Sequence, residues 1–264
     1  MAFNKNELII DRVRSVTVNE LDTGKLIYRL TQIEEPSLNT TAEGEEVTDA
    51  VGALITTLYR SKKATFSASN SLISLDLAAA QYGTKKVVGS ENEKITAINY
   101  QIVKVAEGVT EVTLDKTPSN YENIKWIYSI ENGEIGETYT AAESASDTEF
   151  VIDETGKITV PTGFKGDFFV EYEYETENAV YIRNDASKFP EACTVVIYVI
   201  FRDKCNENIK YSGRIVCPKA KLNPESIELA LTSEGKHAFE FTMLKDYCAS
   251  EDEDELFHVV VSEW

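Results

Sequence analysis

The chain has 264 residues, of which 42% are hydrophobic and 10% aromatic, so it can bury a sizeable core and is not disordered as a whole. Its formal net charge of −19 excludes a conventional nucleic-acid binder, which gathers Lys and Arg to neutralise phosphates. The N-terminus lacks the apolar stretch of a signal peptide, and no segment approaches the roughly 20 apolar residues of a membrane span. We therefore expect a soluble protein, made in a cytoplasm, with no membrane partner.

The first thirty residues predict a long β-hairpin that follows a loose N-terminal segment at residues 1–11. Residues 12–20 alternate imperfectly between valines and polar side chains, which predicts a strand with an irregularity near Arg14. The turn signal at residues 21–24 ends in glycine, and residues 25–33 return as the second strand.

The next segment, residues 34–49, is polar and acidic and predicts a loop. It contains Pro36 and Gly44, and structureless connections of this length in compact domains are usually functional or mobile. A strand pair is expected after it, with residues 54–58 and 62–70 on either side of a turn at 59–61.

Beyond residue 70 the apolar spacing changes from two to that of a helix. We expect Asn70 or Ser71 to cap this helix and Gly83 to end it. The side chains expected on its apolar face are Leu72, Leu75, Ala79 and Tyr82. The helix is expected to cover one face or edge of a sheet rather than to bind a partner.

From about residue 95 to residue 181 short strands alternate with glycine-containing turns such as Asn132-Gly133, which is typical of a small β-sandwich. The expected strands are 101–105, 111–114, 125–130, 149–152, 157–160 and 167–174. We predict an immunoglobulin-like sandwich at residues 96–184, with Trp126 as its core anchor. Tyr172, Tyr174 and Tyr181 could form a sugar platform, but packing within the sandwich is the preferred interpretation.

The last eighty residues predict a four-stranded meander of longer strands, at 194–202, 210–217, 226–232 and 238–243. Pro218 and Pro224 are expected to bracket a short crossing, and 256–264 to form a final strand. In the fourth strand, alternation predicts that Phe239, Phe241 and Met243 face inward. We expect this segment and residues 1–95 to form one domain, 1–95 with 185–264, into which the sandwich is inserted.

The sequence contains no catalytic, metal or cofactor motif. The four cysteines lack zinc spacing, and Cys193 with Cys217 is expected to be a reduced buried pair near the open end of a hairpin. Cys248 with His258 is an example of a possible Cys–His nucleophile pair, but nothing local activates it. Phosphate-loop, dinucleotide-binding and nucleophile-elbow motifs are absent, so we predict no enzyme, no cofactor and no metal.

The order and texture of these elements resemble the major tail proteins, the tail tube subunits, of long-tailed phages and related particles. The resemblance rests on the early hairpin, on the acidic segment after Glu34, on residues 62–66 running into the helix, and on residues 217–241. It covers about two-thirds of the chain and implies a mainly β fold: an antiparallel β-sandwich or barrel with one short helix, plus an inserted immunoglobulin-like module.

The resemblance also implies a virion protein that forms hexameric rings, stacked into a tube through which DNA passes without specific binding. Its partners would then be further copies of itself and other tail proteins. The expected ring-to-ring contacts are Glu34, Glu35, Glu43, Glu45, Glu46 and Asp49. The hydroxyl-rich faces suit either a lumen wall or an ordinary solvent face; their residues are Ser15, Thr17, Asn19, Thr65, Ser67 and Ser69.

The alternative function is a non-enzymatic β-sandwich binding module that recognises a glycan or a receptor, as in a baseplate or host-range protein. The sandwich-like middle and its tyrosines favour it, whereas the absence of a signal sequence and the cysteine usage do not. A hydrolase would need a pocket to which the sequence does not point.

Overall fold

The computed structural model describes residues 7–224, 235–246 and 255–264. The chain forms two compact units by its internal contacts. The split unit comprises Met1–Lys86 and Ile182–Trp264, and the inserted unit is Val87–Tyr181. Three features of the sequence analysis lie outside the described residues: the predicted strand at 226–232, Cys248, and residues 1–6 of the expected loose N-terminal segment.

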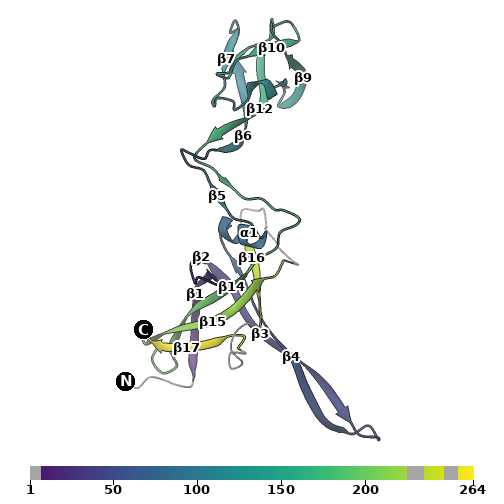
Figure 1. Ribbon diagram of the computed structural model, residues 1–264. Coiled ribbons are helices and arrows are strands. Elements are labelled where there is room, and N and C mark those ends of the chain that lie inside the picture. Colours follow the sequence, from purple (N-terminus) through teal and green to yellow (C-terminus); the bar gives the residue numbers. More distant parts are fainter. Residues whose placement is uncertain (1–6, 225–234, 247–254) are drawn as a thin grey trace. The chain divides into compact units, whose positions relative to one another are not determined.

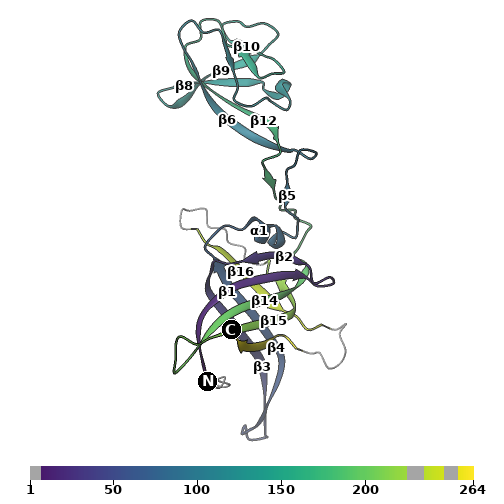
Figure 2. The same cartoon turned by 90° about the vertical axis from the view of Figure 1, so that its left-hand side faces the viewer.

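The split unit is built on one antiparallel sheet (Figures 1 and 2). Its elements are β1 (Leu8–Glu20), β2 (Leu26–Leu30), β3 (Ile33–Thr48), β4 (Leu54–Asn70), α1 (Leu75–Gln81), β14 (Ala192–Asp203), β15 (Lys210–Leu222), β16 (His237–Met243) and β17 (His258–Glu263). The strand order is β2-β1-β14-β15-β16-β4-β3, and β17 pairs with β15 beside this path. The sheet curls into a near-barrel, so the expected mainly β class is confirmed.

Every second side chain along the strands points into the interior of this near-barrel and fills it. In β16, Phe239, Phe241 and Met243 are buried as predicted, and β14 contributes Val195 and Ile197 to the same core. Burying each such side chain is worth roughly 1.5–3 kcal/mol relative to leaving it exposed. The alternation that marks these strands in the sequence therefore also supplies the core.

The predicted first hairpin is present as β1 and β2, and its irregularity lies where the sequence indicated. The register of β1 against β14 shifts between Val13 and Ser15. A bulge places two consecutive residues on the same side of a strand. The extra residue here is Arg14, and beyond it Ser15 and Val16 pair regularly with Tyr198 and Ile197, so Val16 enters the core while Ser15 faces the other side of the sheet.

Two predictions about residues 34–70 are wrong. The expected loop at 34–49 is almost entirely strand β3, and the expected strand pair at 54–58 and 62–70 is the single strand β4. β3 pairs with β4 from Ile33↔Asn70 to Thr48↔Leu54. In such a ribbon the backbone groups between the strands pair with each other and those on the outer edges beyond β16 face solvent, so its side chains need no apolar alternation.

The predicted crossing at Pro218 is also wrong, because this proline lies within β15. The pairs Cys193↔Ala220 and Val195↔Cys217 leave one extra residue on β15, and bulges are where a sheet tolerates proline. The Thr194 hydroxyl donates to the Pro218 carbonyl at 2.9 Å. Cys193 and Cys217 are free and buried, as predicted, and burial raises the pKa of each thiol to about 12.

The helix exists, but its cap and its buried face differ from the prediction. Ser74 is the N-cap, and its side chain accepts from the Leu77 amide at 3.3 Å. The buried face carries Leu77, Ala78 and Gln81 with Ala79, whereas Leu72 and Leu75 are exposed. The observed cap, Ser74, lies four residues after Asn70, the earliest expected cap, and the buried face of the helix differs from the expected one. Gly83 has φ +64° and follows the last turn, as expected.

The inserted unit contains a seven-stranded sheet in the order β6-β12-β8-β9-β10-β11-β7 and a two-stranded ribbon, β13-β5. Its elements are β5 (Val87–Val88), β6 (Ile95–Val105), β7 (Glu111–Thr113), the 3-10 turn η1 (Tyr121–Asn123), β8 (Trp126–Glu131), β9 (Glu134–Ala141), β10 (Glu149–Ile152), β11 (Lys157–Thr159), β12 (Gly166–Thr176) and β13 (Val180–Tyr181). Every strand expected between 95 and 181 is present, and β9 and β13 are additional.

Trp126 is not the core anchor of the inserted unit: its side chain is 51% exposed. Its neighbour Ile127 is fully buried instead, with Phe150 and Phe168. Neighbouring residues of a strand point to opposite faces of the sheet, so Trp126 points outward where Ile127 points into the core. Tyr172 is buried as the packing interpretation required, whereas Tyr181 is exposed.

Candidate assembly surface

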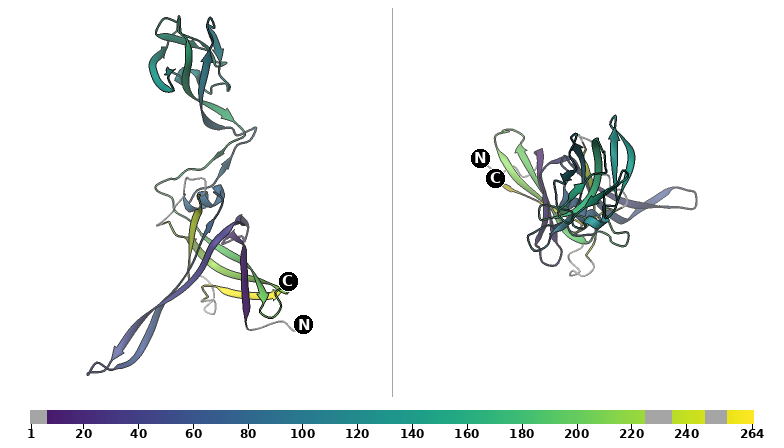
Figure 3. Two further views of the ribbon diagram at one scale, coloured as in Figure 1. Left: turned by 180° about the vertical axis from the view of Figure 1, so that it is seen from behind. Right: turned by 90° about the horizontal axis from the view of Figure 1, so that it is seen from above.

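The distal part of the β3–β4 hairpin, residues 41–63, is here called the arm. β16 pairs with β4 only between residues 65 and 70, so the arm is a two-stranded ribbon that continues beyond the sheet (Figures 1 and 3). No residue of the arm is buried, and only Val47 and Thr57 are partly covered. The arm has no core of its own.

Large apolar side chains nevertheless cover β4 of the arm and its turn. Val51 is 89% exposed and Tyr59 is 75% exposed, and Leu54, Ile55 and Leu58 are exposed as well. An isolated two-stranded hairpin is marginally stable in water, and exposed strand edges are templates for pairing with other chains. The arm therefore has the character of a surface that another molecule covers.

The two faces of the arm differ in chemistry. One face carries the opposite pairs Glu45↔Leu58 and Val47↔Thr56, and the Arg60 guanidinium lies 3.6 Å from the Glu45 carboxylate. On the other face Tyr59 lies opposite Gly44. A Cβ built at position 44 would come within 3.3 Å of the Tyr59 ring, so the glycine lets this ring lie against the ribbon.

Charge is segregated between the two strands of the arm. The acidic residues lie on β3 or in the turn: Glu43, Glu45, Glu46 and Asp49. The basic residues all lie on β4: Arg60, Lys62 and Lys63. One edge of the ribbon is consequently acidic and the other basic.

Both ends of the arm are fixed by local backbone features. At the turn, Asp49 Oδ1 accepts from the amides of Val51 and Ala53 at 3.0 and 2.8 Å, and Gly52 takes φ +88°. At the base, Ser61 has φ +53° where the register shifts. A non-glycine residue in this region costs roughly 1–3 kcal/mol, so the surrounding pairing holds the bulge in place.

The six predicted contact residues fall into two groups. Glu43, Glu45 and Glu46 lie on the arm and Asp49 lies in its turn. The other two belong to the base of the hairpin, where Lys236 lies 2.7 Å from Glu34 and 3.2 Å from Glu35. Hydrogen bonds from Lys236 and Ser71 lower the pKa of the Glu34 carboxyl.

Sequence reasoning missed the apolar side chains of the arm. The signal was present in residues 51–59, where Val51, Leu54, Ile55, Leu58 and Tyr59 occur within nine positions. The sequence prediction places only residues 54–58 in a strand and puts Tyr59 in a turn, so it does not identify an exposed apolar surface.

The two predicted hydroxyl-rich faces lie on different strands. Ser15, Thr17 and Asn19 are on β1, and Thr65, Ser67 and Ser69 are on β4, with β14, β15 and β16 between them in the sheet. Because Val18 and Phe66 enter the core, the neighbouring Thr17 and Thr65 face away from it. Ser15 and Ser69 are themselves buried, with Ser15 Oγ accepting from Arg29 at 3.4 Å.

A family model for the YomU/Tube protein family matches residues 8–254, which include β1 to β16 and the arm. The chain belongs to the YomU/Tube protein family. It is therefore a tube-type structural protein of phage tails, a component of the virion tail that assembles with itself and with other tail proteins. No curated protein matches it.

The structural family indicates a non-enzymatic role for this tube protein. Within the ranges that the structure describes, no group of three or more His, Cys, Asp or Glu side chains could hold a metal ion. In the same part of the chain, no helix has the length and apolar character needed to cross a membrane.

Proposed function

We propose that this protein is the subunit of a tail tube whose rings, hexameric and stacked, form the channel for DNA. The observation that carries the proposal is the arm: a fully exposed ribbon with unpaired edges and apolar side chains, in a chain of a tube family. In this proposal the arm makes the ring-to-ring contact. Residues 1–95 with 185–264 form the tube domain, and 96–184 form an immunoglobulin-like module.

The segregated charges of the arm favour a repeating contact. Acidic β3 placed beside acidic β3 of a second copy would set like charges against each other, whereas β3 beside β4 pairs opposite charges. A contact between two different surfaces of identical subunits is heterologous, and heterologous contacts generate rings or filaments instead of closed dimers. This is the geometry that a stacked tube requires.

The proposed channel wall is formed by polar side chains of β1 and β4. Hydroxyl-bearing faces on β1 and β4 suit a wall that DNA passes without adhering, and a lumen of negative potential would repel phosphate. The net charge of the whole chain does not measure this potential, because most of it belongs to the inserted unit. Ser15 and Ser69 are buried within the subunit, so Thr17, Asn19, Thr65 and Ser67 are the residues with which we expect DNA to be in closest proximity.

Removal of the arm tests the proposal. Residues 42–62 are replaced by an Asn-Gly turn that joins Thr41 to its partner Lys63, which leaves the base of the hairpin and the core untouched. We expect monomers with an unchanged thermal transition and no rings or tubes by electron microscopy at concentrations where the full chain assembles. Tubes formed by the armless protein would contradict the role given to the arm.

A point variant separates loss of contact from loss of structure. Ile55→Lys with Tyr59→Lys places two charges on apolar positions that nothing covers in the subunit, so the subunit should fold normally but fail to assemble. The matched control is Leu72→Lys with Leu75→Lys, which makes the same change at two exposed apolar positions outside the arm and should leave assembly intact. Equal loss of assembly in both variants would refute the assignment.

A further inference from the structure

The inserted unit carries most of the negative charge of the chain. It contains six lysines, no arginine and nineteen acidic residues, a net charge of −13 out of −19. A unit of this charge attracts cationic molecules and repels anionic ones at low ionic strength. Any molecule that binds to it should therefore carry positive charge.

One face of its sheet presents aromatic side chains to solvent. Phe169 of β12 lies between Ile102 of β6 and Tyr128 of β8, its partners on the two neighbouring strands. The centroids of the Tyr128 and Phe169 rings are 6.3 Å apart. Tyr100, which is 73% exposed, and the exposed Trp126 extend the same face. Tyr100 lies opposite Glu171, so a carboxylate is set beside the aromatic rings.

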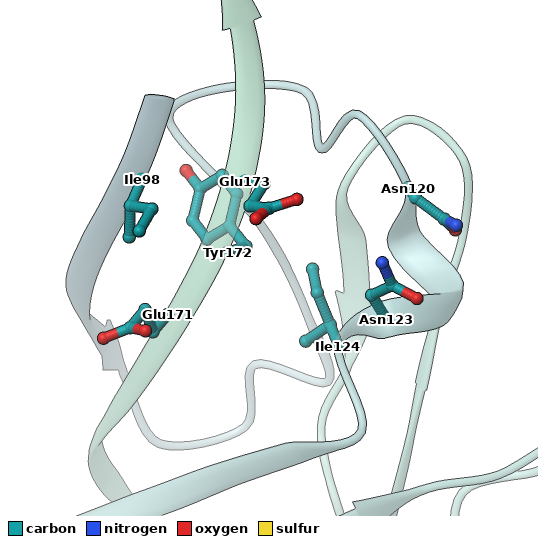
Figure 4. A pocket seen from close by; sticks show the side chains of 7 residues that line it. All are labelled: Ile98, Asn120, Asn123, Ile124, Glu171, Tyr172 and Glu173. Atoms are coloured by element: carbon teal, nitrogen blue, oxygen red, sulfur yellow. The ribbon is translucent and has the colours of Figure 1, made fainter. Parts of the chain in front are cut away.

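A shallow pocket of about 230 Å³ continues this face where β8 diverges from β12 (Figure 4). The lining residues with polar side chains are Asn120, Asn123, Glu171, Tyr172 and Glu173, and Asn120 Oδ1 already accepts from the Glu122 amide at 3.1 Å. Glu173 points toward the turn that bears both asparagines, with Ile124 between them (Figure 4). Glu171 lines the pocket and lies opposite Tyr100, so the aromatic face and the pocket share this residue.

We propose that this face of the inserted unit binds an amine-bearing glycan, a polysaccharide whose sugars carry free protonated amino groups. Tyr and Trp rings offer flat, rigid, amphipathic surfaces on which the apolar face of a sugar ring stacks. Carboxylates and side-chain amides accept and donate hydrogen bonds in the pairs that adjacent hydroxyl and amino groups require. The two carboxylates beside the rings select the protonated amine over a neutral substituent.

A basic peptide is the competing occupant, because it would meet the same charge. The sugar is favoured because Glu171 lies both beside the exposed Tyr100 ring and in a pocket that also bears Glu173 and two asparagines, whereas charge attraction alone needs neither rings nor amides. This inference does not depend on tube formation, since it concerns the inserted unit alone.

The test is binding of the full chain to three probes: a glucosamine oligomer, its N-acetylated counterpart and an oligolysine of the same charge. Trp126 serves as the fluorescent reporter in a Trp264→Phe background, since the chain has two tryptophans. We expect the glucosamine oligomer to perturb Trp126 and to bind at least tenfold more tightly than either other probe, with affinity falling as salt is added. Equal or tighter binding of oligolysine, or no binding of the glucosamine oligomer, would overturn the proposal.

Variants with matched controls assign the residues. Tyr100→Ala should weaken binding of the glucosamine oligomer about tenfold, measured by calorimetry, and Tyr181→Ala should leave it unchanged. Glu171→Gln with Glu173→Gln should remove the preference for the free amine. Glu91→Gln with Glu93→Gln removes the same charge from a turn before β6 and should preserve that preference. Loss of the preference in both double variants would show that net charge alone selects the ligand and would refute the site.

Discussion

His237 should make the split unit sensitive to mild acid, because its ring is buried and engaged at both nitrogens. The Ser74 amide donates to Nδ1 at 3.3 Å, so Nδ1 is the acceptor and the Nε2–H donates to Gln81 Oε1 at 2.7 Å. Gln81 in turn donates to the Ala238 carbonyl at 2.9 Å. The neutral imidazole thus ties the start and the end of α1 to β16, and protonation of Nδ1 would break the contact with Ser74.

Burial lowers the pKa of His237 below its ordinary value of 6.5. A base with a depressed pKa binds its proton more readily in the unfolded chain, so its contribution to stability is present above pH 6.5 and declines as the pH falls toward the native pKa. For one proton, the free energy of unfolding decreases by at most about 1.4 kcal/mol per pH unit in this window. The Glu34 carboxyl, whose pKa is lowered by Lys236 from 4.5, loses its contribution only at more acidic pH.

Denaturant unfolding of the dilute, unassembled chain between pH 7 and pH 5 measures this slope. A Trp126→Phe background leaves Trp264 as the reporter of the split unit. His237→Gln should be less stable by about 1–3 kcal/mol at pH 7, through loss of its two hydrogen-bond partners, and should be nearly independent of pH in the window. His258→Gln, at an exposed position, should keep the slope. A flat profile for the natural chain, or an unchanged slope in His237→Gln, would refute the reasoning.

Two further predictions concern packing and backbone conformation. Phe168→Ala should destabilise the inserted unit by about 3–5 kcal/mol, since this side chain is fully buried, whereas Trp126→Ala should cost about half as much or less, because 51% of this residue is exposed; equal losses in thermal unfolding would contradict the assignment of faces. Gly83→Ala should cost more than Gly163→Ala by about 1–3 kcal/mol, because both have positive φ but only a Cβ at 83 would overlap the Phe189 backbone; similar denaturation midpoints would argue against that close approach.

Regular alternation made much of the fold predictable from the sequence. The core side of β16 follows from Phe239, Phe241 and Met243. The hairpin at Asn132-Gly133 follows because both residues adopt positive φ, as the tight turn requires. These features are local, so a short window of sequence contains the whole cause.

The remaining features depend on contacts that a short window does not contain. The polar stretch at β3 is a strand because β4 pairs with it along its length, and its own side chains give no sign of this. The choice of Ile127 over Trp126 as the buried residue depends on how β8 meets β12. The apolar residues of the arm were visible, but their exposure follows from where β16 stops.

The composition of the arm reconciles two opposing demands on a subunit that must first stay soluble and then polymerise. Apolar side chains on an uncovered ribbon favour association, and alternate pairings of such ribbons lead to aggregation. Charges on the strands oppose this, since Lys62 and Lys63 repel the β4 of a second copy while Glu43 and Glu45 repel its β3. Only β3 of one copy beside β4 of another allows the apolar contact without repulsion between like charges. In the proposed tube, the charges that keep free subunits apart therefore also favour this β3–β4 contact.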